Sequence, residues 1–76
     1  MSNQFMLRQQ VLKLYRNILR AIREVPDEES KKELIQWART DFKNNKNQTD
    51  EYAIKMLIFH GESQLKHLRQ NIAFSR

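Results

Sequence analysis

Apolar side chains recur along the first part of the chain with the spacing of an amphipathic helix. Between residues 5 and 24 they fall on one face at about 100° per residue, with polar side chains on the other face. The apolar face is wide, about 140°, as expected of a helix that contacts two neighbours. It comprises Leu7, Val11, Leu14, Tyr15, Ile18, Leu19, Ile22 and Val25. The pattern predicts a first helix at roughly 5–24.

Two further segments show the same helical spacing. A second helix is predicted at 28–45, with a shorter apolar side formed by Leu34, Ile35, Trp37, Ala38 and Phe42. A third is predicted at 50–73, with a stripe formed by Ile54, Leu57, Ile58, Leu65, Leu68 and Ile72. The alternation typical of strands occurs nowhere over a useful length.

Two breaks separate these segments. Pro26 stands before an acidic run at 27–29, which suits the first turn of a new helix. The polar string 44–48 forms the second break, and Thr49 after it is a good N-cap for the third helix. Short connections favour antiparallel neighbours. We therefore predict an all-α fold, an antiparallel three-helix bundle, in a single domain over residues 1–76.

Length and composition narrow the possible functions. A chain of 76 residues allows one small core, and the lack of Cys excludes disulfides and thiolate metal sites. The longest apolar run, 56–59, is far shorter than the roughly 20 residues of a membrane-spanning helix. There is no glycine-rich loop, and His60 and His67 lie about 10 Å apart along one helix, too far to share a metal ion. We predict no catalytic residues, no metal and no cofactor of the protein's own.

The basic residues gather on one part of the predicted bundle. Residues 1–25 hold Glu24 as their only acid, against Arg8, Lys13, Arg16, Arg20 and Arg23. The second helix adds Arg39, Lys43 and Lys46 beside Phe42. Few i,i+4 ion pairs can form there, so the ridge favours an anionic partner over a merely solvated face. An acidic protein surface fits this ridge at least as well as nucleic acid or a membrane surface does. No recognition motif for nucleic acid is present.

Two motifs carry a resemblance to a known family. The triplet at 14–16 reads Leu-Tyr-Arg, and the segment 37–46 reads Trp-Ala-Arg-Thr-Asp-Phe-Lys-Asn-Asn-Lys. Together they resemble the mitochondrial LYR-motif proteins of the complex I LYR superfamily, and the likeness spans roughly residues 5–70. Members often carry an import presequence, whereas residues 1–10 contain one Arg and no clear cleavage signal. This is consistent with a mature or trimmed form of such a protein.

The resemblance implies a small adaptor that binds the mitochondrial acyl carrier protein in the matrix. In this family the acyl-phosphopantetheine arm of the carrier enters the helical bundle, and basic residues meet the carrier's acidic surface. Carried over by position, the carrier-binding residues are Tyr15, Arg16, Arg39, Phe42, Lys43 and Lys46. For the acyl chain we expect a cavity lined by Leu14, Ile18, Ala38, Leu57 and Gly61. Gly61 has a second interpretation, a close approach between two helices.

The family serves respiratory-complex assembly or iron–sulfur cluster biogenesis, and members similar to this chain are associated with complex I. We therefore expect a role in complex I assembly. The alternatives are iron–sulfur cluster biogenesis, assembly of another respiratory complex and, less favoured, a basic nucleic-acid-binding module. On the third helix, Tyr52, Met56 and Phe59 form a second apolar stripe. It is either buried by the bundle or a surface for a client, a respiratory-complex subunit or assembly intermediate.

Overall fold

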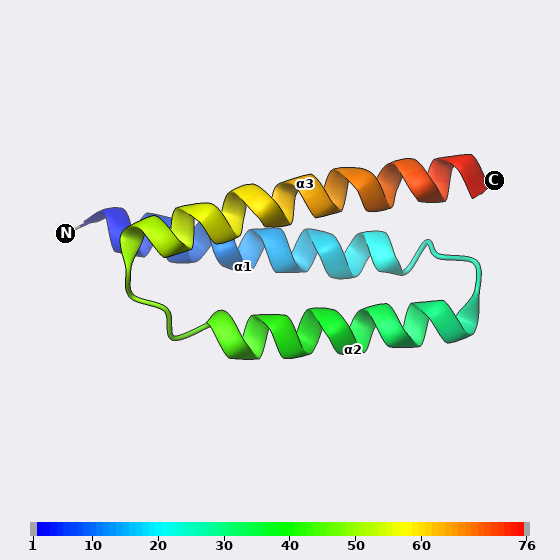
Figure 1. Cartoon of the computed structure of the whole chain (residues 1–76), viewed down its shortest axis with the longest axis horizontal. Coiled ribbons are helices and arrows are strands. Elements are labelled where there is room, and N and C mark those ends of the chain that lie inside the picture. The colour runs from blue at the N-terminus through cyan, green and yellow to red at the C-terminus, as the bar shows by residue number, and fades with distance from the viewer. Residues whose placement is uncertain (1, 76) are drawn as a thin grey trace.

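The computed structural model describes residues 2–75 and contains three α-helices in chain order (Figure 1). They are α1 (Ser2–Ile22), α2 (Glu28–Asn45) and α3 (Glu51–Ser75). α1 and α3 run in the same direction and α2 runs opposite to both, so the bundle is up-down-up (Figure 1). The all-α, antiparallel three-helix bundle predicted from the sequence is confirmed.

The chain between α1 and α2 is shaped by a proline and an aspartate. α1 ends at Ile22, two residues earlier than predicted, and the N–H of Val25 then donates to the carbonyl of Ile22 at 3.0 Å in a tighter turn. Pro26 disfavours helical backbone at the residue before it, which explains the early end. Asp27 is the N-cap of α2, because its carboxylate accepts from the Ser30 N–H at 2.9 Å. α2 has the bounds expected from the sequence.

The other helix ends differ from the predicted positions. α1 begins at Ser2, three residues before the predicted start, and α3 runs from Glu51 to Ser75. The prediction that Thr49 caps α3 is wrong. Asp50 takes that role, since its carboxylate accepts from the Ala53 N–H at 2.9 Å. Both residue types cap helices well, and Asp50, one residue later, is the one that lies three residues before the N–H it accepts from.

The core is built mainly from α1, which packs against both other helices. Ile22 is completely buried, and α2 contributes only Ala38 to the fully buried set. α3 contributes Ile54, Gly61, Leu65 and Ile72. Leu14 of α1 occupies the space beside Gly61, where an added Cβ would collide with Leu14 Cδ2 and lie 3.3 Å from Cγ. Gly61 therefore allows α1 and α3 to approach closely, as one of its two interpretations expects.

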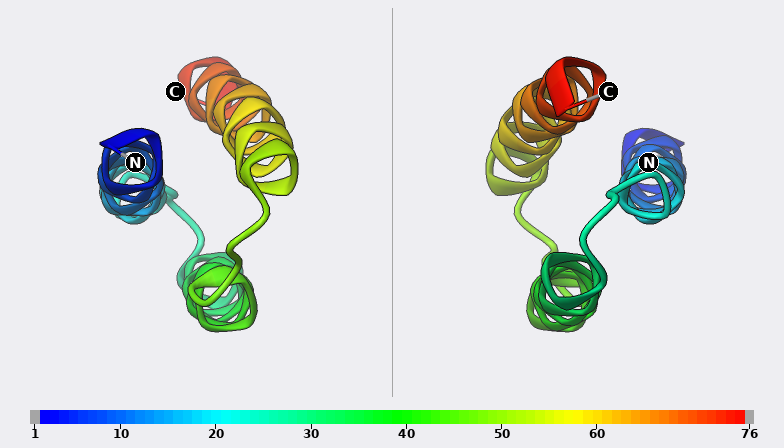
Figure 2. Two further views of the ribbon diagram at one scale, coloured as in Figure 1. Left: turned by 90° about the vertical axis from the view of Figure 1, so that its left-hand side faces the viewer. Right: turned by 90° about the vertical axis from the view of Figure 1, so that its right-hand side faces the viewer.

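α2 and α3 do not pack closely against each other. Within residues 2–75 each of them packs on α1, without a comparable contact between the two. End-on views show the three helices at the corners of a triangle, with α2 set apart from α3 (Figure 2). As a result Trp37, placed on the apolar side of α2, remains 40% exposed. The helical period shows which face of α2 is apolar, but it does not show whether a neighbour covers that face.

Candidate partner-binding site

Phe42 anchors one side of α2 against α1. Its ring meets the ring of Tyr15 edge to face, with centroids 5.1 Å apart and planes at 69°. Beside this pair, Arg16 of α1 and Arg39 of α2 border a depression of about 330 Å³. Its apolar floor is formed by Leu12, Leu19 and Ala38 together with the two rings. Two guanidinium groups thus frame an apolar patch that includes the Phe42 ring.

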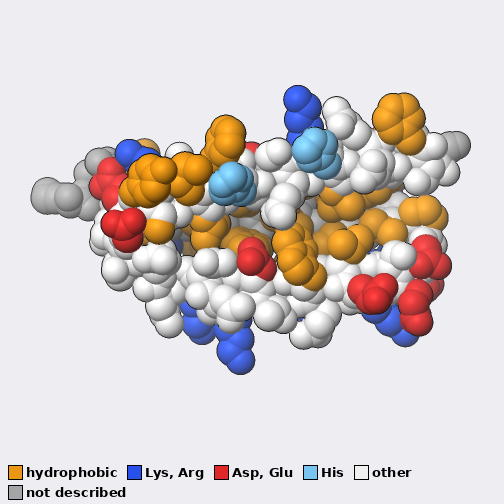
Figure 3. Space-filling view, in the orientation of Figure 1, with side chains coloured by type: hydrophobic (Ala, Val, Ile, Leu, Met, Phe, Trp, Pro, Cys, Tyr) orange, Lys and Arg blue, Asp and Glu red, His pale blue; other side chains and the backbone are white. Residues whose placement is uncertain are grey.

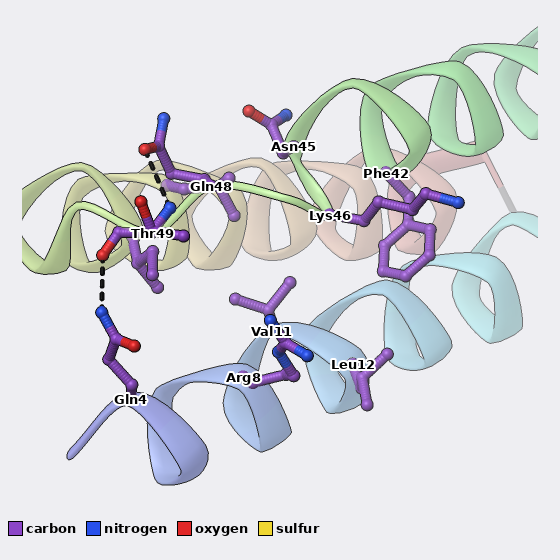
Figure 4. A pocket seen from close by; sticks show the side chains of 11 residues that line it. Gln4, Arg8, Val11, Leu12, Phe42, Asn45, Lys46, Gln48 and Thr49 are labelled. Carbon is purple, nitrogen blue, oxygen red and sulfur yellow. Dashed lines mark hydrogen bonds between the residues drawn. The ribbon is translucent and has the colours of Figure 1, made fainter. Parts of the chain in front are cut away.

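A second, smaller depression of about 60 Å³ adjoins the first, since Leu12 and Phe42 line both (Figure 4). Arg8 from α1 and Lys46 from the end of α2 both line it (Figure 4). The adjoining loop is tied to α1 because Gln4 Nε2 donates to the Thr49 carbonyl at 2.7 Å. Sequence reasoning assigned Arg8 to the cationic ridge but not to the site. The sequence feature that could have indicated this role is the position of Arg8, about one and a half helical turns before the Leu-Tyr-Arg triplet.

We call Arg8, Arg16, Arg39, Lys43 and Lys46 the basic face. All five side chains are exposed, although Lys43 lines neither depression. In the described part of the chain the ion pairs are Lys31 with Glu28 and Lys55 with Glu51, and neither involves this face. The basic face therefore presents positive charge around an apolar centre with no acidic side chain neutralising it from within.

Tyr15 separates the basic face from the opposite side of α2. Its hydroxyl donates a hydrogen bond to the Asp41 carboxylate. Asn45 Nδ2 in turn donates to the Asp41 carbonyl at 2.8 Å and to its carboxylate at 3.3 Å. Burial, and then the hydrogen bond to Asp41 and its charge, raise the pKa of Tyr15 well above its ordinary value. The phenol therefore stays neutral and acts as a hydrogen-bond donor that fastens α2 to α1.

On the far side of α2 an apolar groove runs between α2 and α3, and hydrophobic side chains are visible between these helices (Figure 3). It consists of two adjoining cavities. A near cavity of about 360 Å³ lies toward the α2–α3 loop, and a far cavity of about 410 Å³ lies toward the opposite end. Ile18, Trp37 and Gln64 line both, so the two cavities adjoin along the groove. Such a concave, mostly apolar site on a small bundle is a candidate ligand site.

The groove contains four of the five residues expected in an acyl-chain cavity. Leu14, Ile18, Leu57 and Gly61 line the near cavity. Ala38 does not line the groove; it is buried under the basic face instead. Its position on α2 turns it toward α1, whereas the groove follows the neighbouring Trp37 edge of the helix.

Several groove residues were not predicted as site residues. They are Ile22, Leu34, Trp37, Leu65 and Leu68. Each belongs to an apolar stripe identified from the sequence and was assigned to the core. No feature of the sequence distinguishes these residues from core, because the helical period does not show whether another helix covers the face.

The stripe of Tyr52, Met56 and Phe59 lies on α3 away from the core. Tyr52 is 71% exposed and Phe59 64% exposed, while Met56 is partly buried. The alternative that the bundle buries the stripe is therefore wrong for both aromatic residues. Hydrophobic side chains are visible at the surface over this half of α3 (Figure 3).

Among residues 2–75, no three His, Asp or Glu side chains come together as a possible metal site. None of the helices in this part of the chain combines the length and hydrophobicity that crossing a membrane requires.

The chain is thus a small three-helix bundle with candidate binding surfaces on two sides of α2. The profile of the family described as "Complex 1 protein (LYR family)" matches residues 9–67, and this chain belongs to that family. It is 53% identical to LYR motif-containing protein 2 of Bos taurus, over 96% of this chain and 83% of the relative. It is 54% identical to the Mus musculus protein of that name, over 95% and 82%, and 48% identical to the Homo sapiens one, over 96% and 83%. No solved structure gives a significant match.

Proposed function

We propose that this protein is a non-enzymatic adaptor that binds the acylated mitochondrial acyl carrier protein and acts in respiratory complex I assembly in the mitochondrial matrix. The carrier's acidic surface docks on the basic face, and its acyl-phosphopantetheine arm enters the groove. The prosthetic group belongs to the partner, so this chain supplies only its binding surfaces.

The observation that carries the proposal is the pairing of the two surfaces on one helix. α2 has unpaired Arg and Lys side chains around Phe42 on one edge and an open apolar groove along the other. Charge complementarity brings an acidic protein to the first edge and speeds association. A buried alkyl chain in the second gains about 0.8 kcal/mol per CH₂.

The first experiment is co-purification of the acylated carrier with the Phe42→Ala variant. Phe42 lines both depressions of the basic face, so its loss should reduce carrier capture at least tenfold. Phe74→Ala is the matched control, since Phe74 is 89% exposed and lies near the C-terminal end of α3. Circular dichroism of both variants checks that the helices remain. Undiminished capture by a folded Phe42→Ala protein would contradict the proposal.

The second experiment separates an acidic protein from nucleic acid as the partner of the basic face. An Arg16→Ala, Arg39→Ala double variant should bind the carrier more weakly, and wild-type binding should weaken with added salt. Retention on duplex or single-stranded nucleic acid is measured in parallel at physiological salt. Retention of nucleic acid without carrier binding would support the basic nucleic-acid module instead.

The exposed stripe on α3 supplies a surface for the client. An adaptor has to hold two proteins at once, and Tyr52 and Phe59 lie on a face that neither the core nor the groove uses. A Met56→Lys, Phe59→Lys double variant should retain carrier binding and lose assembly activity. Native gels of each respiratory complex and assays of iron–sulfur enzymes identify the client. Normal assembly of all complexes with this variant would show that the stripe is not the client surface.

A further inference from the structure

The bundle has a second open side, where α1 and α3 face away from α2 (Figure 2). A depression of about 550 Å³ lies there between the two helices. Asn17 of α1 lines it together with Glu62, Lys66, Arg69 and Ala73 of α3, and none of the described residues of α2 takes part. The basic face and the groove both border α2, so the proposed binding of the carrier leaves this side of the bundle uncovered.

Exposed residues form one row along each helix on this side. On α3 the row has seven-residue intervals, which keep side chains near one line of a helix, and it consists of Tyr52, Phe59, Lys66 and Ala73. On α1, Lys13 and Arg20 lie about one turn to either side of Asn17. Met6 stands about two turns before Lys13. Because α1 and α3 run in the same direction (Figure 1), both rows begin with apolar residues and become basic farther along.

The basic part of this side carries positive charge that the fold does not neutralise. Its exposed side chains are those of Lys13, Arg20, Lys66 and Arg69. The ion pairs found among residues 2–75 do not involve them. Glu62 adds a carboxylate to the depression, which the surrounding cations outnumber. This balance of charge favours an acidic partner.

The shape of this side favours a helix as the occupant. A concave surface between two helices accepts a ridge of side chains from a third helix. An extended strand would find no backbone edge to pair with, because the helices bond their own N–H and C=O groups. A membrane surface is flat and anionic, so it would bridge the depression and meet the Glu62 carboxylate.

We propose that an acidic amphipathic helix of the client protein lies in this depression, alongside α1 and α3 and opposite α2. Its apolar residues contact Tyr52 and Phe59, and its Asp and Glu side chains pair with Lys66 and Arg69. From Tyr52 to Ala73 the surface extends about 32 Å along α3, which matches a partner helix of about 21 residues. This inference rests on the proposed function and specifies the chemistry of the client, because the α3 row continues the stripe already assigned to it.

The test uses the carrier-bound protein in a mitochondrial matrix extract, with a photoreactive side chain in place of Ala73 inside the depression. Mass spectrometry of the cross-linked peptides should identify one client segment with helical periodicity and several Asp or Glu residues. A Lys66→Glu, Arg69→Glu double variant should lower the cross-link yield about tenfold, since like charges then face each other. Changing the acids of the identified segment to Lys should restore the yield.

An Arg23→Glu, Lys32→Glu double variant is the matched control, because it makes the same change of net charge at exposed residues that do not line the depression. Its cross-link yield should equal that of the wild type. Carrier capture, measured on the same samples, should be unchanged in both double variants. Loss of capture by the wild-type protein is the separate result that would overturn the proposed function.

Three outcomes would overturn the inference and leave carrier binding intact. They are the absence of a cross-linked client, cross-links confined to neutral or basic segments, and a yield that the Lys66→Glu, Arg69→Glu change does not lower. Sedimentation with vesicles of phosphatidylcholine and phosphatidylglycerol is measured in parallel. Vesicle binding that this double variant abolishes, without a cross-linked client, would assign the surface to anionic lipid instead.

Discussion

The two sides of α3 differ in how they meet the rest of the molecule. Toward α1 the contact is close, because Gly61 lacks a side chain and Leu14 fills the space beside it. Toward α2, within the described residues, the backbone of α3 stays further from its neighbour, and a groove of two cavities remains between the helices. The same helix therefore has one closed interface and one open interface.

This difference shows where the protein keeps its own stability and where it leaves surface for a ligand. Helices α1 and α3 form most of the buried core, and α2 attaches to α1 through Ala38, the Tyr15–Phe42 ring contact and the hydrogen bond to Asp41. A chain of this size has few kcal/mol of net stability, so apolar area left uncovered is a substantial part of the total. A ligand that covers it stabilises the folded state by mass action.

The largest expected effect comes from comparing two leucines on the two interfaces. Leu65 is 7% exposed and belongs to the core cluster with α1, although it also borders the far cavity, whereas Leu34 is only partly buried beside the groove. Leu65→Ala should lower the free energy of unfolding by about 3 kcal/mol, whereas Leu34→Ala should lower it by about 1 kcal/mol because less apolar surface is lost. Urea titrations of the free protein measure both. Equal losses would mean that the α2 side is as closed in solution as the α1 side.

Gly61 allows the closed interface to be broken from the α3 side. Gly61→Leu should lower the free energy of unfolding by about 2 kcal/mol, since the new side chain must displace Leu14 from a packed core. Gly61→Ala is the milder control: the end of the Leu14 side chain can rotate away, and Ala favours a helix over Gly by about 1 kcal/mol.

Combining Gly61→Leu with Leu14→Ala tests the assignment to this contact. The double variant should be less destabilised than the sum of the two single variants, because the second change removes the displaced side chain. Simple additivity would place the strain of Gly61→Leu somewhere other than Leu14.

Sequence periodicity predicted most of the fold because each helix carries its own apolar stripe. The bounds of α2 followed from Pro26 and from the polar residues after Phe42. The end of α1 and the cap of α3 differ from the prediction, since neighbouring residues compete for these positions. Val25 belongs to the apolar stripe but precedes Pro26, and Thr49 and Asp50 are both good caps.

The candidate site was predicted only in part. Helical periodicity and composition indicate which face of a helix is apolar or charged, but not which other helix lies against that face. Phe42 and its flanking Arg39 and Lys46 were identified from a motif that is contiguous in sequence. The far cavity joins residues from three helices, and only the missing α2–α3 contact distinguishes it from core. The hydrogen bond from Tyr15 to Asp41 likewise spans 26 positions, and no local pattern indicates it.

The smallest expected effect concerns that hydrogen bond, which holds α2 beside the open interface. Tyr15→Phe should lower the free energy of unfolding by about 1–2 kcal/mol, since Asp41 loses a donor and keeps Asn45. The substitution should also change how the free energy of unfolding depends on pH.

The pKa of Tyr15 is raised in the folded state above its ordinary value of 10.0, chiefly by burial and by the hydrogen bond to Asp41. Its contribution is therefore fully present below pH 10 and is lost as the pH rises further, when the unfolded chain ionises first. Thermal midpoints between neutral and strongly alkaline pH should fall less steeply for Tyr15→Phe than for the wild type, whereas Tyr52→Phe, at an exposed tyrosine of α3, should keep the wild-type slope. If both variants lose stability with the same slope as the wild type, Tyr15 does not fasten α2 through a neutral phenol.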